Sequence, residues 1–337
     1  MKVAILAPVA WRTPPRHYGP WEQVASNIAE GLINLGVNVT LFATGDSITA
    51  GKLSSVCDVG YEEKPNQDAK VMECLHISSL MEQAESFDII HNNFDFLPLT
   101  YSGLINTPLI TTIHGFSSER IIPVYKKYNK SGYYVSISNS DRSPELDYAA
   151  TVYNGLNCNN FDFNNTPEDY LLFLGRIHPD KGTAEAIEIA KRSKRRLIIA
   201  GIVQDSGYFN EKIKPMLNTE IQYIGSVGPA EKNILLGKAC ALLHPILFNE
   251  PFGLSVAEAM LCGTPVIAYN KGSMPELINN GKTGFLVKNV DQAVQCVNEL
   301  KYIDRINCHE WAITKFSMEK MVADYLQLYE LILANEI

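Results

Sequence analysis

The stretch YLLFLGRIHPDKGTAEAIEIAKRSKRRLIIAG, residues 170–201, contains one complete strand–helix–strand unit. Its opening run, 170–175, is apolar and of strand length, which is typical of a strand buried on both faces of a parallel sheet. Apolar residues recur at helical spacing over 183–194, and a second apolar run follows at 196–201. This order of elements predicts a parallel β-sheet with helices packed on its faces.

The same alternation continues in both directions along the chain. Toward the C-terminus, we expect strands at 221–225, 240–245 and 265–269 and a helix at 253–263. The N-terminal half repeats the pattern, with strands expected at 3–8, 37–45, 87–92, 109–114 and 133–138 and a helix at 21–36. Two doubly wound, Rossmann-like α/β domains would account for this repetition.

The polar stretch NCNNFDFNNTPED, 157–169, has the composition of a linker between the two halves. A chain of 337 residues also predicts two domains, at about 150 residues each. We expect an N-terminal domain over 1–160, a C-terminal domain over 161–312, and a C-terminal helix over 313–337 that packs back towards the N-terminal domain. Ligands of open parallel sheets bind outside the carboxyl ends of the strands, so site residues should follow strands.

Composition disfavours several classes of protein. The net charge is −8, from 29 Lys and Arg against 37 Asp and Glu, whereas nucleic-acid binders carry a basic surplus. Seven scattered cysteines without a C-x-x-C pair argue against structural zinc and a disulfide framework, and predict reduced thiols in a cytoplasmic protein. The first ten residues lack the pattern of a signal peptide, and no run approaches 18 apolar residues, so we expect no membrane span.

Two cations lie in the loop GRIHPDKG, 175–182, directly after the first strand of the second half. Arg176 and Lys181 are placed there beside the N-terminus of the expected helix, where free backbone N–H groups favour negative charge. Two cations and these amides favour a phosphate or diphosphate ligand. Solvated surface charges are the alternative interpretation, which the position after a strand makes weaker.

Two carboxylates lie in the segment 249–276, NEPFGLSVAEAMLCGTPVIAYNKGSMPE. Pro251 and Gly253 put Glu250 in a turn before a helix, and Glu258 falls about two turns into that helix. Carboxylates accept hydrogen bonds from hydroxyls, and free amides donate to phosphate oxygens. The pair therefore suits a phosphate that carries a sugar. The spacing of eight residues between the two glutamates is not by itself evidence of a site.

These segments resemble the retaining glycosyltransferases of family 4, also called glycosyl transferases group 1. That family has the GT-B fold, in which two Rossmann-like domains face each other and the cleft between them is the active site. The resemblance covers nearly the whole chain and is carried by residues 18–47, 111–115, 153–155, 170–190, 250–287 and 311–329.

The resemblance implies a role for each matching residue of the second half. Arg176 and Lys181 would hold the donor diphosphate and stabilise the leaving group. Glu258 would accept hydrogen bonds from the ribose hydroxyls, and Glu250 would contact the donor sugar. The backbone amides that would help Glu250 belong to Phe252, Gly253 and Leu254.

In the first half, the resemblance implies that His114 reaches the donor sugar from across the cleft. Gly19 would belong to a loop that closes on the diphosphate. The family usually has two glycines where this chain has Gly19–Pro20, and Pro20 removes an N–H that could bind phosphate. Ser273 similarly replaces a second glycine that is common in the family.

The resemblance also implies the reaction: a sugar moves from a nucleoside diphosphate sugar to a hydroxyl acceptor, forming an α-glycosidic bond with retention. A uridine diphosphate sugar is the first expectation for the donor. No two Asp are separated by one residue, so the D-x-D metal–nucleotide signature is missing and we expect neither metal nor cofactor. The acceptor cannot be read from the motifs. A soluble or polysaccharide-like acceptor is favoured over a lipid, because basic residues of the first half form only a small cluster at Lys126, Lys127 and Lys130.

Two alternatives remain open. One is a nucleotide-sugar 2-epimerase of the same fold, which an acceptor-independent product would reveal. The other is a non-catalytic subunit that binds a sugar nucleotide, which turnover of a donor would exclude. A dinucleotide-dependent dehydrogenase is disfavoured, because the chain contains no G-x-G-x-x-G.

Overall fold

The computed structural model describes residues 1–17, 19–64, 67–116 and 118–337. These residues form two compact units. Unit 1 comprises residues 1–156 and 318–337, and unit 2 comprises residues 157–317. The domain boundary that we expected at residue 160 therefore lies at residue 156.

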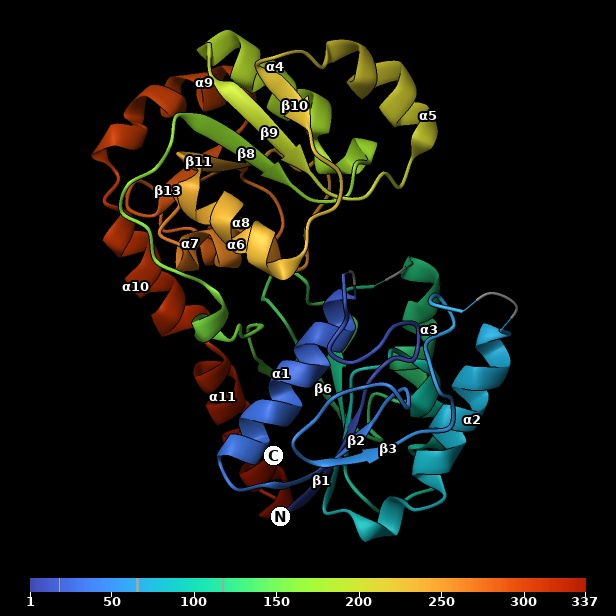
Figure 1. The fold of residues 1–337 in the computed structure, drawn as a ribbon. Coiled ribbons are helices and arrows are strands. Elements are labelled where there is room, and N and C mark those ends of the chain that lie inside the picture. Colours follow the sequence, from blue (N-terminus) through green and yellow to red (C-terminus); the bar gives the residue numbers. More distant parts are fainter. Residues whose placement is uncertain (18, 65–66, 117) are drawn as a thin grey trace. The chain divides into compact units, whose positions relative to one another are not determined.

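Unit 1 is built on a parallel sheet of seven strands, in the order β3-β2-β1-β4-β5-β6-β7 within the described residues (Figure 1). The strands are β1 (Lys2–Leu6), β2 (Asn38–Phe42), β3 (Lys52–Ser54), β4 (Ile89–Asn92), β5 (Leu109–Ile113), β6 (Tyr133–Ser136) and β7 (Tyr148–Thr151). The five expected strands of this half are β1, β2, β4, β5 and β6. Strands β3 and β7 were not predicted, because short edge strands of partly exposed residues have no readable periodicity.

Four α-helices of unit 1 flank this sheet among the described residues. They are α1 (Pro20–Asn34), α2 (Ala69–Met81), α3 (Ile122–Lys127) and α11 (Met318–Leu333). Although α1 and α11 stand near opposite ends of the chain, they pack side by side (Figure 1). Gly31 permits the close approach, because a Cβ atom there would lie 2.4 Å from Cγ2 of Val322.

A buried polar network fixes α11 against the sheet. His91 on β4 hydrogen-bonds through Nδ1 to the Tyr329 hydroxyl (2.6 Å) and through Nε2 to Thr112 Oγ1 (2.7 Å). Thr112 Oγ1 also lies 2.7 Å from the Tyr325 hydroxyl. Burial lowers the pKa of His91 to about 3, so its ring is neutral at physiological pH. The last helix is therefore part of unit 1, although unit 2 precedes it in the chain.

Unit 2 repeats the architecture with a parallel sheet of six strands, in the order β10-β9-β8-β11-β12-β13. The strands are β8 (Tyr170–Leu174), β9 (Arg196–Ala200), β10 (Ile221–Tyr223), β11 (Ala241–His244), β12 (Val266–Tyr269) and β13 (Gly284–Val287). All but β13 were expected. The two parallel sheets confirm the predicted α/β fold class.

The helices of unit 2 lie between its strands and after the last strand. They are α4 (Thr183–Ser193), α5 (Ser206–Tyr208), α6 (Pro229–Lys238), α7 (Leu254–Leu261), α8 (Met274–Leu277), α9 (Val290–Glu299) and α10 (Arg305–Phe316). The C-terminal helix expected from residue 313 is thus two helices, α10 in unit 2 and α11 in unit 1. No helix among the described residues is long and apolar enough to cross a bilayer.

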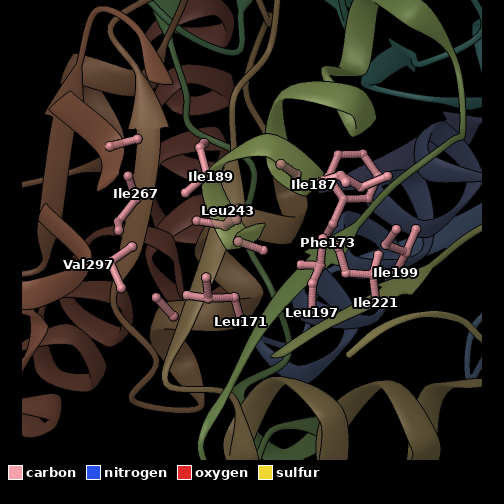
Figure 2. Packing of buried hydrophobic residues seen from close by; sticks show 14 of the residues in the cluster. Leu171, Phe173, Ile187, Ile189, Leu197, Ile199, Ile221, Leu243, Ile267 and Val297 are labelled. Atoms are coloured by element: carbon pink, nitrogen blue, oxygen red, sulfur yellow. The ribbon is translucent and has the colours of Figure 1, made fainter. Parts of the chain in front are cut away.

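The core of unit 2 explains the apolar run that opens it. Leu171 and Phe173 of β8 are buried in a cluster with Ile187 of α4 and Val297 of α9 (Figure 2). Leu172, which alternates with them, is also fully buried. The strand is therefore covered on both faces, as the run predicted. Full burial of each such side chain contributes about 1.5–3 kcal/mol to folding.

Candidate functional site

The loop after β8 brings Lys181 to the end of β11. Gly175 and Arg176 follow the strand, and a short 3₁₀ turn, Pro179–Lys181, leads into α4. Gly182 completes the turn in the left-handed region, with φ of 73°. A Cβ atom there would lie 2.0 Å from the carbonyl oxygen of Pro245, so the backbone after β8 packs directly on the backbone after β11.

The structure brings Lys181 and Glu250 together. Lys181 Nζ donates to Glu250 Oε2 at 2.5 Å, and each side chain is only 14% exposed. The ammonium group also lies 4.6 Å from the centre of the Phe248 ring. A cation and a carboxylate shielded from solvent at the carboxyl edge of a parallel sheet can bind opposite parts of one polar ligand.

Arg176, the second predicted phosphate ligand, has a different partner. Its guanidinium donates to the side-chain oxygen of Gln204, which follows β9, and lies 4.0 Å from Asp180 Oδ2. Its side chain is about one-quarter exposed. The structure thus places Arg176 in the same loop as Lys181 but outside the Lys181–Glu250 contact.

The loop that carries Glu250 is held by backbone contacts with residues 272–273. Gly272 has φ of 55°, and a Cβ atom there would lie 2.3 Å from the backbone nitrogen of Glu250. Ser273 donates from its backbone N–H to the carbonyl of Glu250 (3.0 Å) and from its hydroxyl to the carbonyl of Phe252 (2.5 Å). Ser273, which differs from the family glycine, is therefore a buried support of this loop.

The N-terminus of α7 follows directly. Gly253 is the N-terminal cap, with φ of 95° and no side-chain hydrogen bond to the helix. Leu254 begins the helix, so the amides predicted to bind a ligand lie at its positive end. The φ of Gly253, which side-chain-bearing residues rarely adopt, explains the glycine at this position, whereas an added Cβ atom would meet Cε of Met274, the end of a flexible side chain, at 2.7 Å.

Glu258, on α7, is paired with a lysine that the sequence analysis did not single out. Lys232 Nζ donates to Glu258 Oε1 at 2.6 Å, and the carboxylate is largely buried. Lys232 belongs to α6 and also lies 5.8 Å from the centre of the Phe161 ring. Each of the two predicted glutamates therefore has its own lysine. No local pattern could have identified Lys232, because its partner lies 26 residues away.

His244 is the second residue that the sequence analysis missed. It is the last residue of β11 and is 6% exposed. Its Nε2 lies 3.8 Å from Glu250 Oε2 and has no hydrogen-bond partner among the described residues. Burial and the nearby charge of Lys181 lower the pKa of His244 to about 3, so the ring is neutral at physiological pH. Its position at the end of an expected strand was the only available signal.

His114 lies at the carboxyl edge of the sheet in unit 1, directly after β5. Its Nε2 is 3.0 Å from Asn93 Oδ1, and its ring stacks on Trp21 with 5.7 Å between ring centroids. Burial lowers the pKa of His114 to about 3. The ring is thus a neutral group held between two side chains, and its contact with a donor sugar stays a prediction.

Gly19 precedes α1 with φ of 147°, a region that favours glycine, and Pro20 is the first residue of the helix. A Cβ atom on Gly19 would lie 2.9 Å from Oε2 of Glu22. Burial raises the pKa of Glu22 to about 7. The family segment begins at Tyr18, which lies outside the described residues. A phosphate contact at Gly19 stays a prediction.

No three His, Cys, Asp or Glu side chains in the described part of the chain lie close enough together to hold a metal ion. Independence from metals stays a prediction that a chelator can test, and independence from an organic cofactor also stays a prediction.

Comparisons with known proteins concern the family and the fold of the chain. Residues 159–305 match the family model described as "Glycosyl transferases group 1". An uncharacterized glycosyltransferase of Methanocaldococcus jannaschii is 23% identical over 98% of this chain and 94% of its own length. AviGT4, a glycosyltransferase involved in avilamycin A biosynthesis, superposes with a TM-score of 0.74 at 22% identity, covering 99% of this chain and 98% of its own. The Anabaena protein HepE, solved with UDP-glucose, superposes with a TM-score of 0.71 at 17% identity, covering 99% of this chain and all of its own. These structures share the fold predicted from the sequence.

Proposed function

We propose that this chain, a GT-B-fold glycosyltransferase whose residues 159–305 belong to the glycosyl transferases group 1, transfers a sugar from a UDP-sugar to a hydroxyl acceptor and forms an α-glycosidic bond with retention. The nucleotide-sugar donor follows from the family. Retention and the α bond rest on the resemblance to family 4. Uridine as the base is supported by HepE, a protein of the same fold that was solved with UDP-glucose.

The Lys181–Glu250 contact is the observation that carries the proposal. A diphosphate needs cations and N–H donors, whereas a sugar needs hydrogen-bond acceptors for its hydroxyls. Lys181 supplies the cation and Glu250 the acceptor, 2.5 Å apart at the carboxyl edge of the sheet. The N-terminus of α7 adds amides beside them, and Glu258 adds a second acceptor on the same helix.

The proposed mechanism is displacement at the anomeric carbon through a state with oxocarbenium character. Breaking the bond to the β-phosphate leaves negative charge on the phosphate and positive charge on the sugar. Lys181 and the α7 amides would stabilise the leaving phosphate, and Glu250 would stabilise the sugar. Arg176 would join them after exchanging Gln204 for a phosphate oxygen. The leaving phosphate would accept the proton of the attacking hydroxyl, so the protein mainly positions its reactants.

A thermal-shift screen of nucleoside diphosphate sugars tests the donor. A ligand at a hundred times its Kd adds about 2.7 kcal/mol of stability, so the melting temperature should rise measurably with the correct donor. UDP-glucose is the first compound, with ADP-glucose and GDP-mannose as matched controls for the base. Failure of every nucleoside diphosphate sugar to stabilise the protein would contradict the proposal.

Turnover then separates the proposal from the alternatives. The donor should release UDP and glycosylate a hydroxyl acceptor, and addition of EDTA should leave the rate unchanged. The anomeric proton coupling in the NMR spectrum of the product reports whether the configuration is retained. A 2-epimerised product formed without any acceptor would identify an epimerase, and tight donor binding without turnover would identify a non-catalytic subunit.

A further inference from the structure

In the structure, Lys181 binds Glu250, the carboxylate that would act together with it on the donor. Its ammonium group is 2.5 Å from Glu250 Oε2. If the proposed function is correct, the diphosphate is a second anion that competes with Glu250 for the ammonium group of Lys181. Lys181 must then weaken its contact with Glu250 as it approaches the phosphate, which leaves a shielded carboxylate with less compensation. Such a group is costly unless another donor replaces the lost one.

His244 is placed to be that donor. Its Nε2 is 3.8 Å from the same carboxylate oxygen, Glu250 Oε2, which is too far for a hydrogen bond in the present arrangement. The atom is buried without a partner among the described residues, and a buried ring nitrogen without a partner requires a physical explanation. A shift of the carboxylate by about 1 Å toward the ring would give a hydrogen bond of ordinary length.

We propose that Glu250 passes from Lys181 to His244 when the donor diphosphate binds: Lys181 moves to the phosphate, and His244 Nε2–H takes over the hydrogen bond to Glu250 Oε2. His244 is a positioning residue in this scheme, because it acts on the sugar through Glu250. The inference rests on the proposed function for its trigger, and on contacts within unit 2 for its geometry.

The charges around His244 suit this exchange. Among the described residues, Lys181 faces it from the turn after β8 and Glu250 faces it from the loop before α7. The burial and the lysine that lower the pKa of His244 also keep the ring neutral. A neutral imidazole carries one N–H. It can therefore hold the carboxylate without adding a full positive charge beside the sugar, where positive charge develops during the reaction.

The first experiment needs no ligand and so does not depend on the proposed function. Lys181→Met removes the competing cation, and Glu250 should then turn to His244. In ¹⁵N-labelled protein, the His244 Nε2 should be the protonated nitrogen, with a downfield N–H proton typical of a hydrogen bond to a carboxylate. This signal should vanish in Lys181→Met/Glu250→Gln. Protonation at Nδ1 in Lys181→Met, or a signal indifferent to Glu250, would overturn the inference.

The second experiment uses the reaction. His244→Leu removes the N–H in a similar volume, whereas His244→Gln retains an N–H near the position of Nε2. Because a hydrogen bond to a charged group is involved, His244→Leu should weaken UDP binding and lower kcat, with the two losses together amounting to about tenfold or more. His244→Gln should restore most of both losses. In a Glu250→Gln background, His244→Leu should have little further effect on kcat.

These outcomes separate the inference from the proposed function. A His244→Leu variant with the UDP affinity and the kcat of the unsubstituted protein would overturn the inference while leaving the function intact. If the unsubstituted protein binds no nucleoside diphosphate, the proposed function is contradicted. The NMR experiment would then still show whether His244 donates to Glu250 once Lys181 is removed. A purely structural His244 would lower the melting temperature without the losses of UDP affinity and kcat in the folded protein.

Discussion

Lys181 has a shielded charge, and its predicted phosphate contact makes it the first single residue to test. Lys181→Ala should weaken UDP binding by about 1.5–3 kcal/mol, as for a hydrogen bond to a charged group, and leave uridine binding unchanged. Calorimetric titration with both ligands measures this difference. Lys282→Ala, which removes an exposed lysine of the same unit, is the control. Equal affinity of Lys181→Ala and the unsubstituted protein for UDP would remove Lys181 from the phosphate site.

The two glutamates should differ in the kinetic step that they affect. Glu258 is assigned to the ribose, which does not change in the reaction, so Glu258→Gln should raise the donor KM with kcat largely preserved. Glu250 is assigned to the sugar, where charge develops, so Glu250→Gln should lower kcat with a modest change in KM. Steady-state kinetics on both variants provides the comparison. Unchanged kcat and KM in both would show that the site is misplaced.

Among the elements, α6 and α7 are joined by the Lys232–Glu258 pair. If Lys232 orients Glu258 for the ribose, Lys232→Met should raise the Kd of UDP several-fold, because a buried carboxylate loses its partner. The same substitution should leave the Kd of 2′,3′-dideoxy-UDP unchanged, because that nucleotide lacks both hydroxyls. Lys238→Met, at the exposed end of α6, is the control. Equal losses for both nucleotides would indicate a general effect on folding.

The 3₁₀ turn before α4 depends on Gly182. Gly182→Ala would place a Cβ atom 2.0 Å from the carbonyl oxygen of Pro245 and would hold alanine at φ of 73°. We expect a loss of at least about 2 kcal/mol in the free energy of unfolding, since left-handed alanine alone costs 1–2 kcal/mol. Urea denaturation measures the free energy of unfolding of each variant. Gly175→Ala, where an added Cβ meets nothing within 4 Å, should be close to neutral.

At the scale of the whole molecule, the packing of α11 on the sheet of unit 1 includes a buried histidine, His91, that is neutral in the folded protein. The folded pKa of His91 is about 3 against an ordinary value of 6.5, so the unfolded chain binds the proton more readily. The stability contributed by neutral His91 is therefore complete above pH 6.5 and is lost as the pH falls toward 3.

The unsubstituted protein should thus lose about 2 kcal/mol through His91 between pH 7.5 and pH 5. His91→Gln should be less stable at pH 7.5 but should lack this part of the acid dependence. Urea denaturation at the two pH values measures the difference. A His91→Gln variant with the full acid dependence would assign the loss to other groups.

Local patterns were enough to predict the alternation of strands and helices and the two α/β units. They also predicted the loops that carry Lys181 and Glu250 and the helix that carries Glu258. The signals for these features lie within windows of a few residues, as hydrophobic periodicity and turn residues do. Edge strands β3 and β7 were not predicted, because three or four residues are too few to show a hydrophobic alternation.

Contacts between residues that are far apart in the sequence could be identified only in the folded structure. Lys181 meets Glu250 across 69 positions, and His91 meets Tyr329 across 238. Lys232 gave no local signal, and His244 gave only its position at the end of an expected strand. Arg176, expected at the phosphate, donates to Gln204 instead. The physical reason is that strand order and backbone packing set these contacts: β8 lies beside β11, and Gly182 packs on Pro245, which brings Lys181 to Glu250. The residues next to Lys181 in the sequence do not indicate that Glu250 will be its partner.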